Sequence, residues 1–199
     1  MELREQRFGI EIEMTGITRA GAAKVAATYF GTRSEYVGTY YQTYAAVDQE
    51  GRQWKFMSDG SIRAEKKVNG EKRAAGAVYR TEMVSPICRY EDIEKIQELI
   101  RELKKKGAIV NESCGIHVHI DASPFDAGKL RNLTNIMAAK EDLIYKALGV
   151  SVERQHRWCR PVEERFLEEL NRRRPTSMEA VEEIWYNGRS RRGQHYDQS

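Results

Sequence analysis

The sequence of 199 residues predicts an α+β fold, because strand-like and helix-like patterns both recur along it. Residues 7–14 and 114–121 alternate polar and apolar side chains with a period of two, which is typical of half-buried strands. Residues 90–107 repeat isoleucine and leucine at three- and four-residue steps, the spacing of an amphipathic helix. A chain of this length can bury a full-sized core. We therefore expect one domain over residues 1–199, in which helices back a sheet.

The first part of the chain predicts a strand, a helix and a hairpin, in that order. RFGIEIEM, at 7–14, is the first strand. The alanine-rich segment 18–31 begins with a threonine able to cap a helix and ends with a glycine able to stop one. Residues 36–57 are rich in tyrosine and threonine and contain DQEG at 48–51, which indicates two short strands joined by a turn.

The middle of the chain predicts a loop, a strand and the clearest helix. Residues 63–76 are charged, punctuated by glycine and without an apolar period, which favours a mobile surface loop. Residues 77–87 alternate again until Pro86, so we expect another strand there. The helix expected at 90–107 carries acidic residues early and lysines late, which suits the helix dipole.

The second half of the chain is predicted to be mainly helical. After the histidine-bearing strand 114–121, a long helical pattern occupies 126–149, with an aspartate at its start and a glycine at its end. Two shorter helices are expected at 162–171 and 177–185. The last residues, 186–199, show no period that predicts structure.

The charge balance argues against some classes of partner. There are 33 lysines and arginines against 30 acidic residues, a net charge of +3, so neither nucleic acid nor a membrane surface is indicated. No apolar run approaches the length of a membrane span. The three cysteines are widely spaced, which disfavours a disulfide framework or a zinc knuckle. The expectation is a cytoplasmic protein.

Two of the predicted strands carry paired ionisable side chains on one face. Alternation places Glu11 with Glu13, and His117 with His119, while the apolar side chains of each strand are expected to face the core. Burying bare carboxylates is unfavourable, and a hard cation such as Mg²⁺ compensates them through oxygen ligands. For either pair alone, an ordinary solvent-facing side of a strand is the better interpretation.

A third strand with polar side chains makes a shared site a better interpretation than separate solvent-facing strands. Arg80 and Glu82 share a face within 77–87, so three strands bring acids, a base and imidazoles to one sheet. Such a convergence predicts a polar bowl that holds divalent ions. A metallohydrolase that uses the two histidines with Glu11 or Asp121 around Zn²⁺ or Mn²⁺ is a competing hypothesis.

The motifs FGIEIEM, SDGS, TEMVSPI and CGIHVHID follow one another along the chain. In this order they resemble the amidoligases, a family of carboxylate-amine ligases. The similarity runs from Arg7 to Asp121 and continues more loosely through 126–149. It implies a glutamine synthetase-like fold, whose largely antiparallel sheet forms the polar bowl and is backed by helices. It also implies ATP-dependent formation of an amide or isopeptide bond through an acyl phosphate, with two or more Mg²⁺ ions, or Mn²⁺ in their place.

The resemblance also implies roles for individual residues. The acidic motifs and the histidine strand are expected to hold the metal ions. The implied metal ligands are Glu11, Glu13, Glu82 and His117, and His119 is expected to contact the nucleotide phosphates or to position the metal cluster. SDGS resembles a D-x-S signature of the family, so Asp59 and Ser61 are expected to orient the substrate as catalytic residues.

Basic side chains are needed as well. ATP brings about four negative charges and the glutamates about three more, which two Mg²⁺ ions alone would not balance. Arg80 is the first candidate for a catalytic cation. Lys55 and Arg63 are weaker candidates for nucleotide contacts, as is Arg131, and a solvated surface position is the alternative for these three.

The sequence departs from the family at its end. Amidoligases run on into an R-Y-x-x-L-N-type segment and a strand containing E-F-R, and this sequence stops before both. We therefore expect the family's C-terminal strand, with its glutamate ligand and an arginine, to be missing. The expected substrates are a small-molecule or peptide carboxylate and an amine. Their identity, homo-oligomerisation, and the alternative of a catalytically silent relative that binds a ligand or partner all stay open.

Overall fold

The computed structural model describes residues 2–186. The contacts of the chain divide it into two compact units, Met1–Asp121 and Ala122–Ser199, which we call the sheet unit and the helical unit. The expectation of one domain over residues 1–199 stays a prediction.

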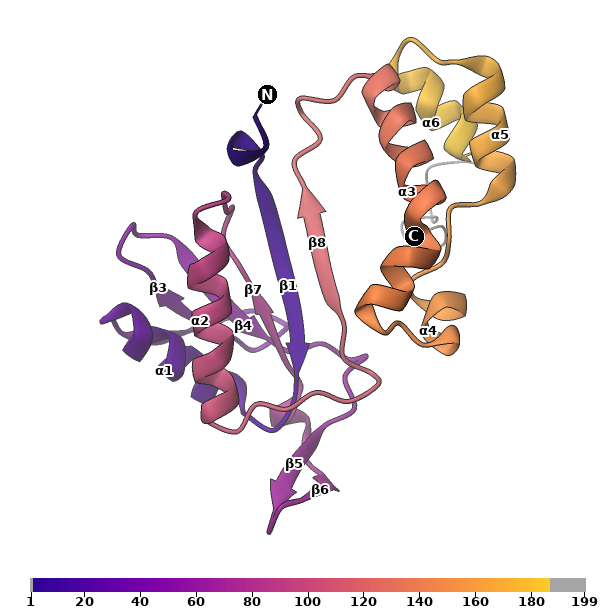
Figure 1. The fold of residues 1–199 in the computed structure, drawn as a ribbon. Helices are drawn as coiled ribbons and strands as arrows, with labels where there is room; N and C mark the ends of the chain where they lie inside the picture. Colours follow the sequence, from indigo (N-terminus) through magenta and orange to yellow (C-terminus); the bar gives the residue numbers. More distant parts are fainter. Residues whose placement is uncertain (1, 187–199) are drawn as a thin grey trace. The chain divides into compact units, whose positions relative to one another are not determined.

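A six-stranded antiparallel sheet forms the centre of the sheet unit (Figure 1). The strand order is β2-β3-β4-β7-β1-β8, so β1 lies between β7 and β8. The predicted α+β class and the largely antiparallel sheet are confirmed, whereas the glutamine synthetase-like fold stays a prediction. The strands are β1 (Phe8–Met14), β2 (Ser34–Gly38), β3 (Thr43–Val47), β4 (Gln53–Met57), β7 (Thr81–Val84) and β8 (Ile116–Ile120).

Two helices, α1 (Arg19–Phe30) and α2 (Asp92–Lys105), cover one face of this sheet (Figure 1). Thr18 caps α1 by accepting a hydrogen bond from the backbone N–H of Gly21 at 3.1 Å, as predicted. Gly31, with φ of 69°, ends the helix in the left-handed conformation that favours glycine. Both predicted helices are therefore present, and their ends follow local capping rules.

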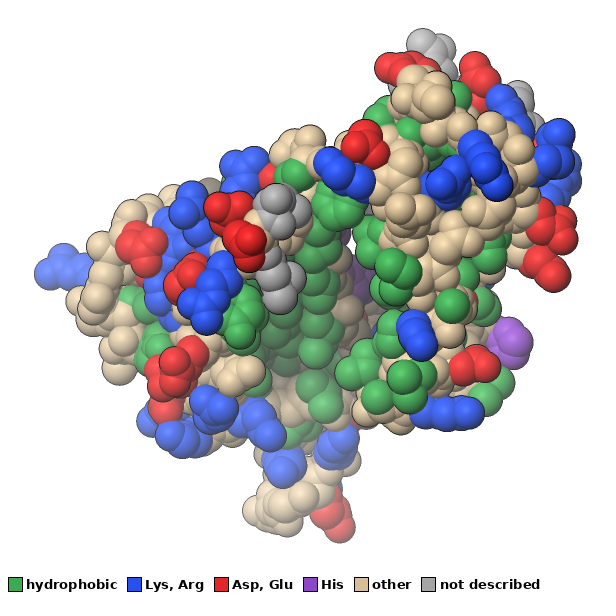
Figure 2. Space-filling view, turned by 45° about the horizontal axis from the view of Figure 1, so that its top comes forward, with side chains coloured by type: hydrophobic (Ala, Val, Ile, Leu, Met, Phe, Trp, Pro, Cys, Tyr) green, Lys and Arg blue, Asp and Glu red, His purple; other side chains and the backbone are tan. Residues whose placement is uncertain are grey.

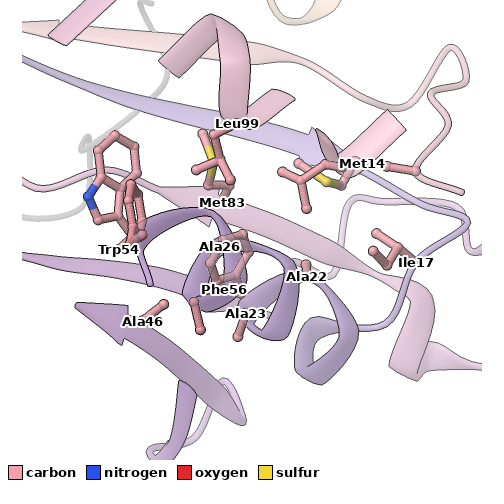
Figure 3. Packing of buried hydrophobic residues seen from close by; sticks show 14 of the residues in the cluster. Met14, Ile17, Ala22, Ala23, Ala26, Ala46, Trp54, Phe56, Met83 and Leu99 are labelled. Carbon is pink, nitrogen blue, oxygen red and sulfur yellow. The ribbon is translucent and has the colours of Figure 1, made fainter. Parts of the chain in front are cut away.

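The core of the sheet unit lies between these helices and the strands. Alanines of α1 at positions 22, 23, 26 and 27 are buried, and their small size lets the helix approach β3 and β4 closely. Figure 3 shows Trp54, Phe56 and Met83 of the sheet packed with Leu99 of α2. All four of these side chains are fully buried. This dense packing makes one face of the sheet rigid and leaves the opposite face for chemistry.

The prediction of two strands in 36–57 was incomplete. β3 and β4 are those strands, and β2 adds a third at the edge of the sheet. Thr39 and Gln42 in the β2–β3 connection both have positive φ, 77° and 51°. Neither residue type announces such a conformation, so the sequence did not reveal this turn.

The prediction of a mobile loop over 63–76 is wrong. These residues form a separate hairpin of β5 (Glu65–Val68) and β6 (Glu71–Ala74). Asn69 and Gly70 join the strands with φ of 52° and 86°, the conformation of a two-residue hairpin turn. The Asn-Gly pair was the available signal. Both faces of these strands carry charged residues, so the segment shows no polar–apolar alternation that would have indicated a hairpin.

The strand expected at 77–87 is shorter in the structure. A 3-10 helix, η2 (Ala77–Tyr79), precedes β7, and another, η1 (Leu3–Glu5), precedes β1. Because β7 has only four residues, Arg80 lies just outside it on extended backbone. Glu82 remains inside the strand.

The expected burial of the apolar face of β8 is also wrong. Ile116, Val118 and Ile120 are 64%, 57% and 50% exposed. α1 packs over β2, β3, β4 and β7, whereas β8 is the edge strand on the other side of β1. Alternation correctly sorted the side chains of β8 into two faces, but it could not show that no helix of the sheet unit covers the apolar one.

Four helices make up the described part of the helical unit. Asp126 caps the first of them, and Gly149 ends it, as predicted. The short α4 was not predicted, because six residues give too little periodicity. The other three helices pack around a small core of Ala127, Leu170, Val181 and Ile184. The helices are α3 (Ala127–Leu148), α4 (Val152–Arg157), α5 (Glu164–Arg173) and α6 (Met178–Tyr186). The tail at 186–199, whose sequence shows no period that predicts structure, falls almost wholly outside the described residues.

Charged side chains of both signs are interspersed over the face shown in Figure 2, which agrees with the net charge of +3. Within residues 2–186 no helix is both long enough and apolar enough to cross a bilayer. Within the described residues, Cys88, Cys114 and Cys159 form no disulfide bond.

Candidate active site

The face of the sheet opposite α1 and α2 carries the predicted polar side chains. In the register of the sheet, Glu13 of β1 lies opposite Glu82 of β7, and Glu11 lies opposite His117 of β8. Residues that face each other across an antiparallel pair point to the same side. The neighbouring core residues, Met14 and Met83, point the other way and are buried. The three strands therefore do bring their polar side chains to one face.

Glu13, Asp59 and Glu82 form the tightest group, which we call the acidic cluster. One carboxylate oxygen from each residue lies within 4.8 Å of the others. Two oxygens bound to one Mg²⁺ at about 2.1 Å are at most about 4.2 Å apart, so a small inward movement would let the cluster hold an ion. Hard oxygen ligands of this kind suit Mg²⁺ or Mn²⁺.

Neighbouring groups fix the orientation of Glu13. The hydroxyl of Ser61 donates to Oε1 at 3.0 Å, and the backbone N–H of Gly115 donates to Oε2 at 2.6 Å. Asp59 in turn accepts a hydrogen bond at 2.6 Å from the backbone N–H of Ser61. The turn after β4 and the residue before β8 thus hold two of the three carboxylates in place. The predicted catalytic residues Asp59 and Ser61 both lie at the cluster.

Glu82 shows that the acidic cluster lacks positive charge. Its side chain is 8% exposed, and burial raises its pKa to about 7, assisted by repulsion from the nearby Glu11, Asp59 and Glu13. In the part of the chain that the structure describes, no basic group forms an ion pair with any carboxylate of the cluster. A divalent cation would supply the missing charge, so the residues present fit a metal ion.

Glu11 lies beside the two histidines. Its Oε2 is 3.4 Å from Nδ1 of His117, and its Oε1 is 3.4 Å from Nε2 of His119. Both imidazoles are more than half exposed. This group, Glu11–His117–His119, borders the acidic cluster because Glu11 and Glu13 share one face of β1. The predicted metal ligands thus form two adjacent groups, and His117 pairs with Glu11.

Two of the predicted cations lie on the same face as the acids. Lys55 of β4 is opposite Val84, which is in turn opposite Glu11, so all three share a row across the sheet. Arg80 is two residues before Glu82 on extended backbone, and alternation directs both side chains to one face. The Nε of Arg80 is buried and lacks a hydrogen-bond partner among the described residues. Its donor is therefore unsatisfied in the described part of the chain.

The other predicted cations are placed elsewhere. Arg63 is half exposed and forms ion pairs with Glu65 at 3.1 Å and with Glu112 at 2.8 Å. These carboxylates already compensate its charge, so contact with a phosphate would require it to leave them. Arg131 is part of α3 in the helical unit. Neither residue gains support as a nucleotide contact from its surroundings.

A cavity of about 370 Å³ lies at the start of β1, beside His119. Gly9, Glu11 and His119 help to line it. Asp121 and Arg7 also line it and form an ion pair of 2.6 Å with each other. Because Asp121 is held by Arg7, it is a poorer partner for the histidines than Glu11.

Sequence reasoning placed Asp59 with the substrate and did not include it among the metal ligands. The available signal was its position two residues after the end of β4, in a polar turn. The strand order was needed to see its meaning, because β4 pairs directly with β7 and Met57 lies opposite Glu82. The Gly115 N–H was missed as well, since backbone donors carry no residue-specific signal.

A known protein family matches almost the whole chain. The family model described as "Putative amidoligase enzyme" matches residues 4–199. No curated protein and no solved structure matches the chain. The match covers both the strands that carry the acidic cluster and the helical unit.

Proposed function

The chain belongs to the family described as "Putative amidoligase enzyme", and on that basis we propose that it joins a carboxylate to an amine, using ATP and Mg²⁺ at the acidic cluster. The observation that carries the proposal is the set of three carboxylates whose ligand atoms lie within 4.8 Å of one another. A cluster that raises the pKa of one of its members to about 7 is poorly compensated by the protein alone. A bound cation resolves this imbalance.

Glu13, Asp59 and Glu82 are the proposed metal ligands of this cluster, with Glu11 and His117 beside them. When bound, the ion would neutralise phosphate charge and orient the transferred group. Ser61 and the Gly115 N–H hold both oxygens of Glu13, which fixes the direction of its remaining lone pairs. Glu82 carries no such restraint in the described part of the chain and is free to adjust to the ion.

The proposed reaction uses ATP as co-substrate and has two steps. An oxygen of the substrate carboxylate attacks the γ-phosphorus and ADP leaves, which converts a poor leaving group into phosphate. The amine nitrogen then attacks the acyl carbon, phosphate leaves, and the nitrogen gives up a proton to solvent water. Arg80 and Lys55 are the proposed cations for the charge that develops on the phosphoryl oxygens, and His119 is the proposed phosphate contact.

Binding and turnover test this proposal separately. Glu82→Gln should weaken Mn²⁺ binding, measured by electron paramagnetic resonance, by roughly tenfold or more, because one charged ligand is removed. Glu82 is a cleaner site than Glu13, since Gln at position 13 would lose an acceptor for one of two donors. Glu94→Gln on the exposed side of α2 is the matched control and should bind Mn²⁺ normally.

Release of phosphate from ATP tests the reaction itself. The full chain should release phosphate only when Mg²⁺, a carboxylate and an amine are all present, and Glu82→Gln should abolish that release. Normal Mn²⁺ affinity in Glu82→Gln would contradict the site. Release that does not depend on an amine would contradict the reaction.

The position of Glu11 between two histidines favours one second candidate, a Zn²⁺- or Mn²⁺-dependent hydrolase. Such an enzyme needs no nucleotide. Hydrolysis of ester or amide substrates with Zn²⁺ and without ATP, lost in His119→Ala, would favour this candidate over the ligase.

A further inference from the structure

A second polar site lies on the helix-covered side of the sheet, around Arg19. Tyr44 lies opposite Phe56, which is buried in the core, and Tyr36 lies opposite Tyr44. Met57, the next residue along β4, lies opposite Glu82 and therefore faces the acidic cluster. The site around Arg19 is thus on the other face from the acidic cluster, and ligand binding there is independent of the proposed function.

Arg19 is a buried cation without a carboxylate partner among the described residues. Its side chain is at the start of α1 and is only 4% exposed. Burial lowers the pKa of its guanidinium from the ordinary value, since the charged form loses solvation. Buried charges are normally paired, so this arrangement calls for an anion.

The donors of Arg19 are only partly satisfied. Nη1 donates to the carbonyl oxygens of Ala77 and Arg80 at 2.9 and 3.1 Å, and Nη2 donates to Oε1 of Gln42. A guanidinium has five N–H groups, so these three bonds leave one on Nη2 and the one on Nε. Nε is buried and has no partner in the described part of the chain.

Gln42 occupies the place that a ligand would take. Nε and Nη2 form one edge of the guanidinium, and a carboxylate binds such an edge through two parallel hydrogen bonds. The single amide oxygen of Gln42 satisfies only one of these donors. Gln42 is itself exposed and lies in the β2–β3 turn, so its side chain can move aside. A carboxylate that replaced it would also reach Nε.

A cavity of about 430 Å³ lies beside Arg19 and Gln42. Arg19, Gln42, Tyr36 and Tyr44 line it together with Val78. The two tyrosine rings are 4.9 Å apart between centroids, and Tyr36 and Val78 are more than half exposed. The walls are therefore aromatic and aliphatic, and Arg19 is the single cation among the lining residues.

We propose that this cavity is a binding site for a small monocarboxylate, whose carboxylate displaces Gln42 to pair with Arg19 and whose apolar body packs on Tyr36, Tyr44 and Val78. One positive charge balances a carboxylate of charge −1. It does not balance a phosphate, which carries about −1.5 to −2 charges at neutral pH.

The side-chain signals of arginine provide a direct test. Full-length protein labelled with ¹⁵N is titrated with sodium acetate, propionate or benzoate, with chloride and inorganic phosphate at matched ionic strength as contrasts. The Nε–H signal of Arg19, identified by its loss in Arg19→Lys, should shift saturably with at least one carboxylate. Chloride and phosphate should leave it unchanged.

Two variants of Gln42 should change the affinity for an added carboxylate in opposite directions. Gln42→Glu places a carboxylate beside Arg19, so it should weaken binding of the added carboxylate roughly tenfold or more and raise the melting temperature. Gln42→Ala removes the internal competitor and should tighten binding several-fold. Neither variant touches the acidic cluster.

The proposal is overturned if no carboxylate shifts the Arg19 signal up to about 50 mM, where a millimolar site would be saturated. A shift with phosphate but not with carboxylates would also overturn it. So would equal carboxylate affinity in wild-type protein and Gln42→Glu. None of these results would bear on ATP-dependent ligation at the acidic cluster, which is measured by metal binding and phosphate release.

Discussion

Two groups of acids in the sheet unit, each with buried members, have opposite electrostatic surroundings. Asp48 and Asp92 are 1% and 9% exposed at their side chains, and Arg52 forms ion pairs with both, at 2.9 and 2.7 Å. Lys95 lies 3.3 Å from Asp92. The acidic cluster of Glu13, Asp59 and Glu82 has no such basic partner among the described residues. One group is fully paired, and the other is not.

The pKa values of the two groups reflect this difference. Hydrogen bonds from Arg52 hold the pKa of the Asp92 carboxyl well below its usual range. In the acidic cluster, burial raises the pKa of Glu82 to about 7. The paired group ties the β3–β4 turn to the start of α2 and serves stability. The unpaired group costs stability, which is a reason to regard it as a functional site.

Removing the cation from the paired group should have the largest effect. Arg52→Met leaves Asp48 and Asp92 buried with only Lys95 nearby, so the free energy of unfolding should fall by about 3 kcal/mol. Urea denaturation measures this loss. Arg101→Met, an exposed arginine of α2, is the control and should change stability by less than about 0.5 kcal/mol. A similar stability for Arg52→Met and the control would remove the contrast between the two groups.

Neutralising Glu82 in the acidic cluster should stabilise the protein, whereas Arg52→Met should destabilise it. The pKa of Glu82 is about 7 in the folded protein against an ordinary value of 4.5. The folded state therefore binds more protons between these values, and stability should fall as pH rises from about 4.5 to about 7. Glu82→Gln removes that loss and should stabilise metal-free protein at pH 8 by on the order of 3 kcal/mol.

Asp92→Asn provides the comparison for this pH dependence. Because the pKa of Asp92 is lowered by folding, its contribution is present above the ordinary pKa of an aspartate and is lost as pH falls below it. Asp92→Asn should therefore destabilise the protein at pH 7. If Glu82→Gln also destabilises the protein at pH 8, with EDTA present, the acidic cluster is not under electrostatic strain.

The smallest effect is expected at the hydrogen bonds that support the acidic cluster. Ser61→Ala removes the hydroxyl that donates to Glu13 at 3.0 Å. The loss of one hydrogen bond to a carboxylate should weaken Mn²⁺ binding by about 1 kcal/mol, or several-fold, because Glu13 is less well oriented. Ser34→Ala on the exposed edge strand β2 is the control. Unaltered Mn²⁺ affinity in Ser61→Ala would mean that Gly115 alone positions Glu13.

Much of the candidate site could be predicted from alternation alone. A period of two put Glu11 with Glu13 and His117 with His119, and the strand register then made Glu13 a neighbour of Glu82. Alternation failed where strands are exposed on both faces, as at the β5–β6 hairpin and on the apolar face of β8. Alternation also could not place Asp59, because a residue in a turn belongs to neither face of the sheet.

The sequence by itself determined which side chains share a face of each strand, where α1, α2 and α3 begin and end, and the likeness to a ligase family. These are local properties, set by backbone geometry and by capping groups within a few residues. Only the tertiary structure decided that Asp59 joins the acidic cluster, that Arg63 is held by Glu65 and Glu112, and that Arg19 is buried with no carboxylate partner among the described residues. Such facts depend on strand order and burial, which arise from contacts between residues far apart in the chain.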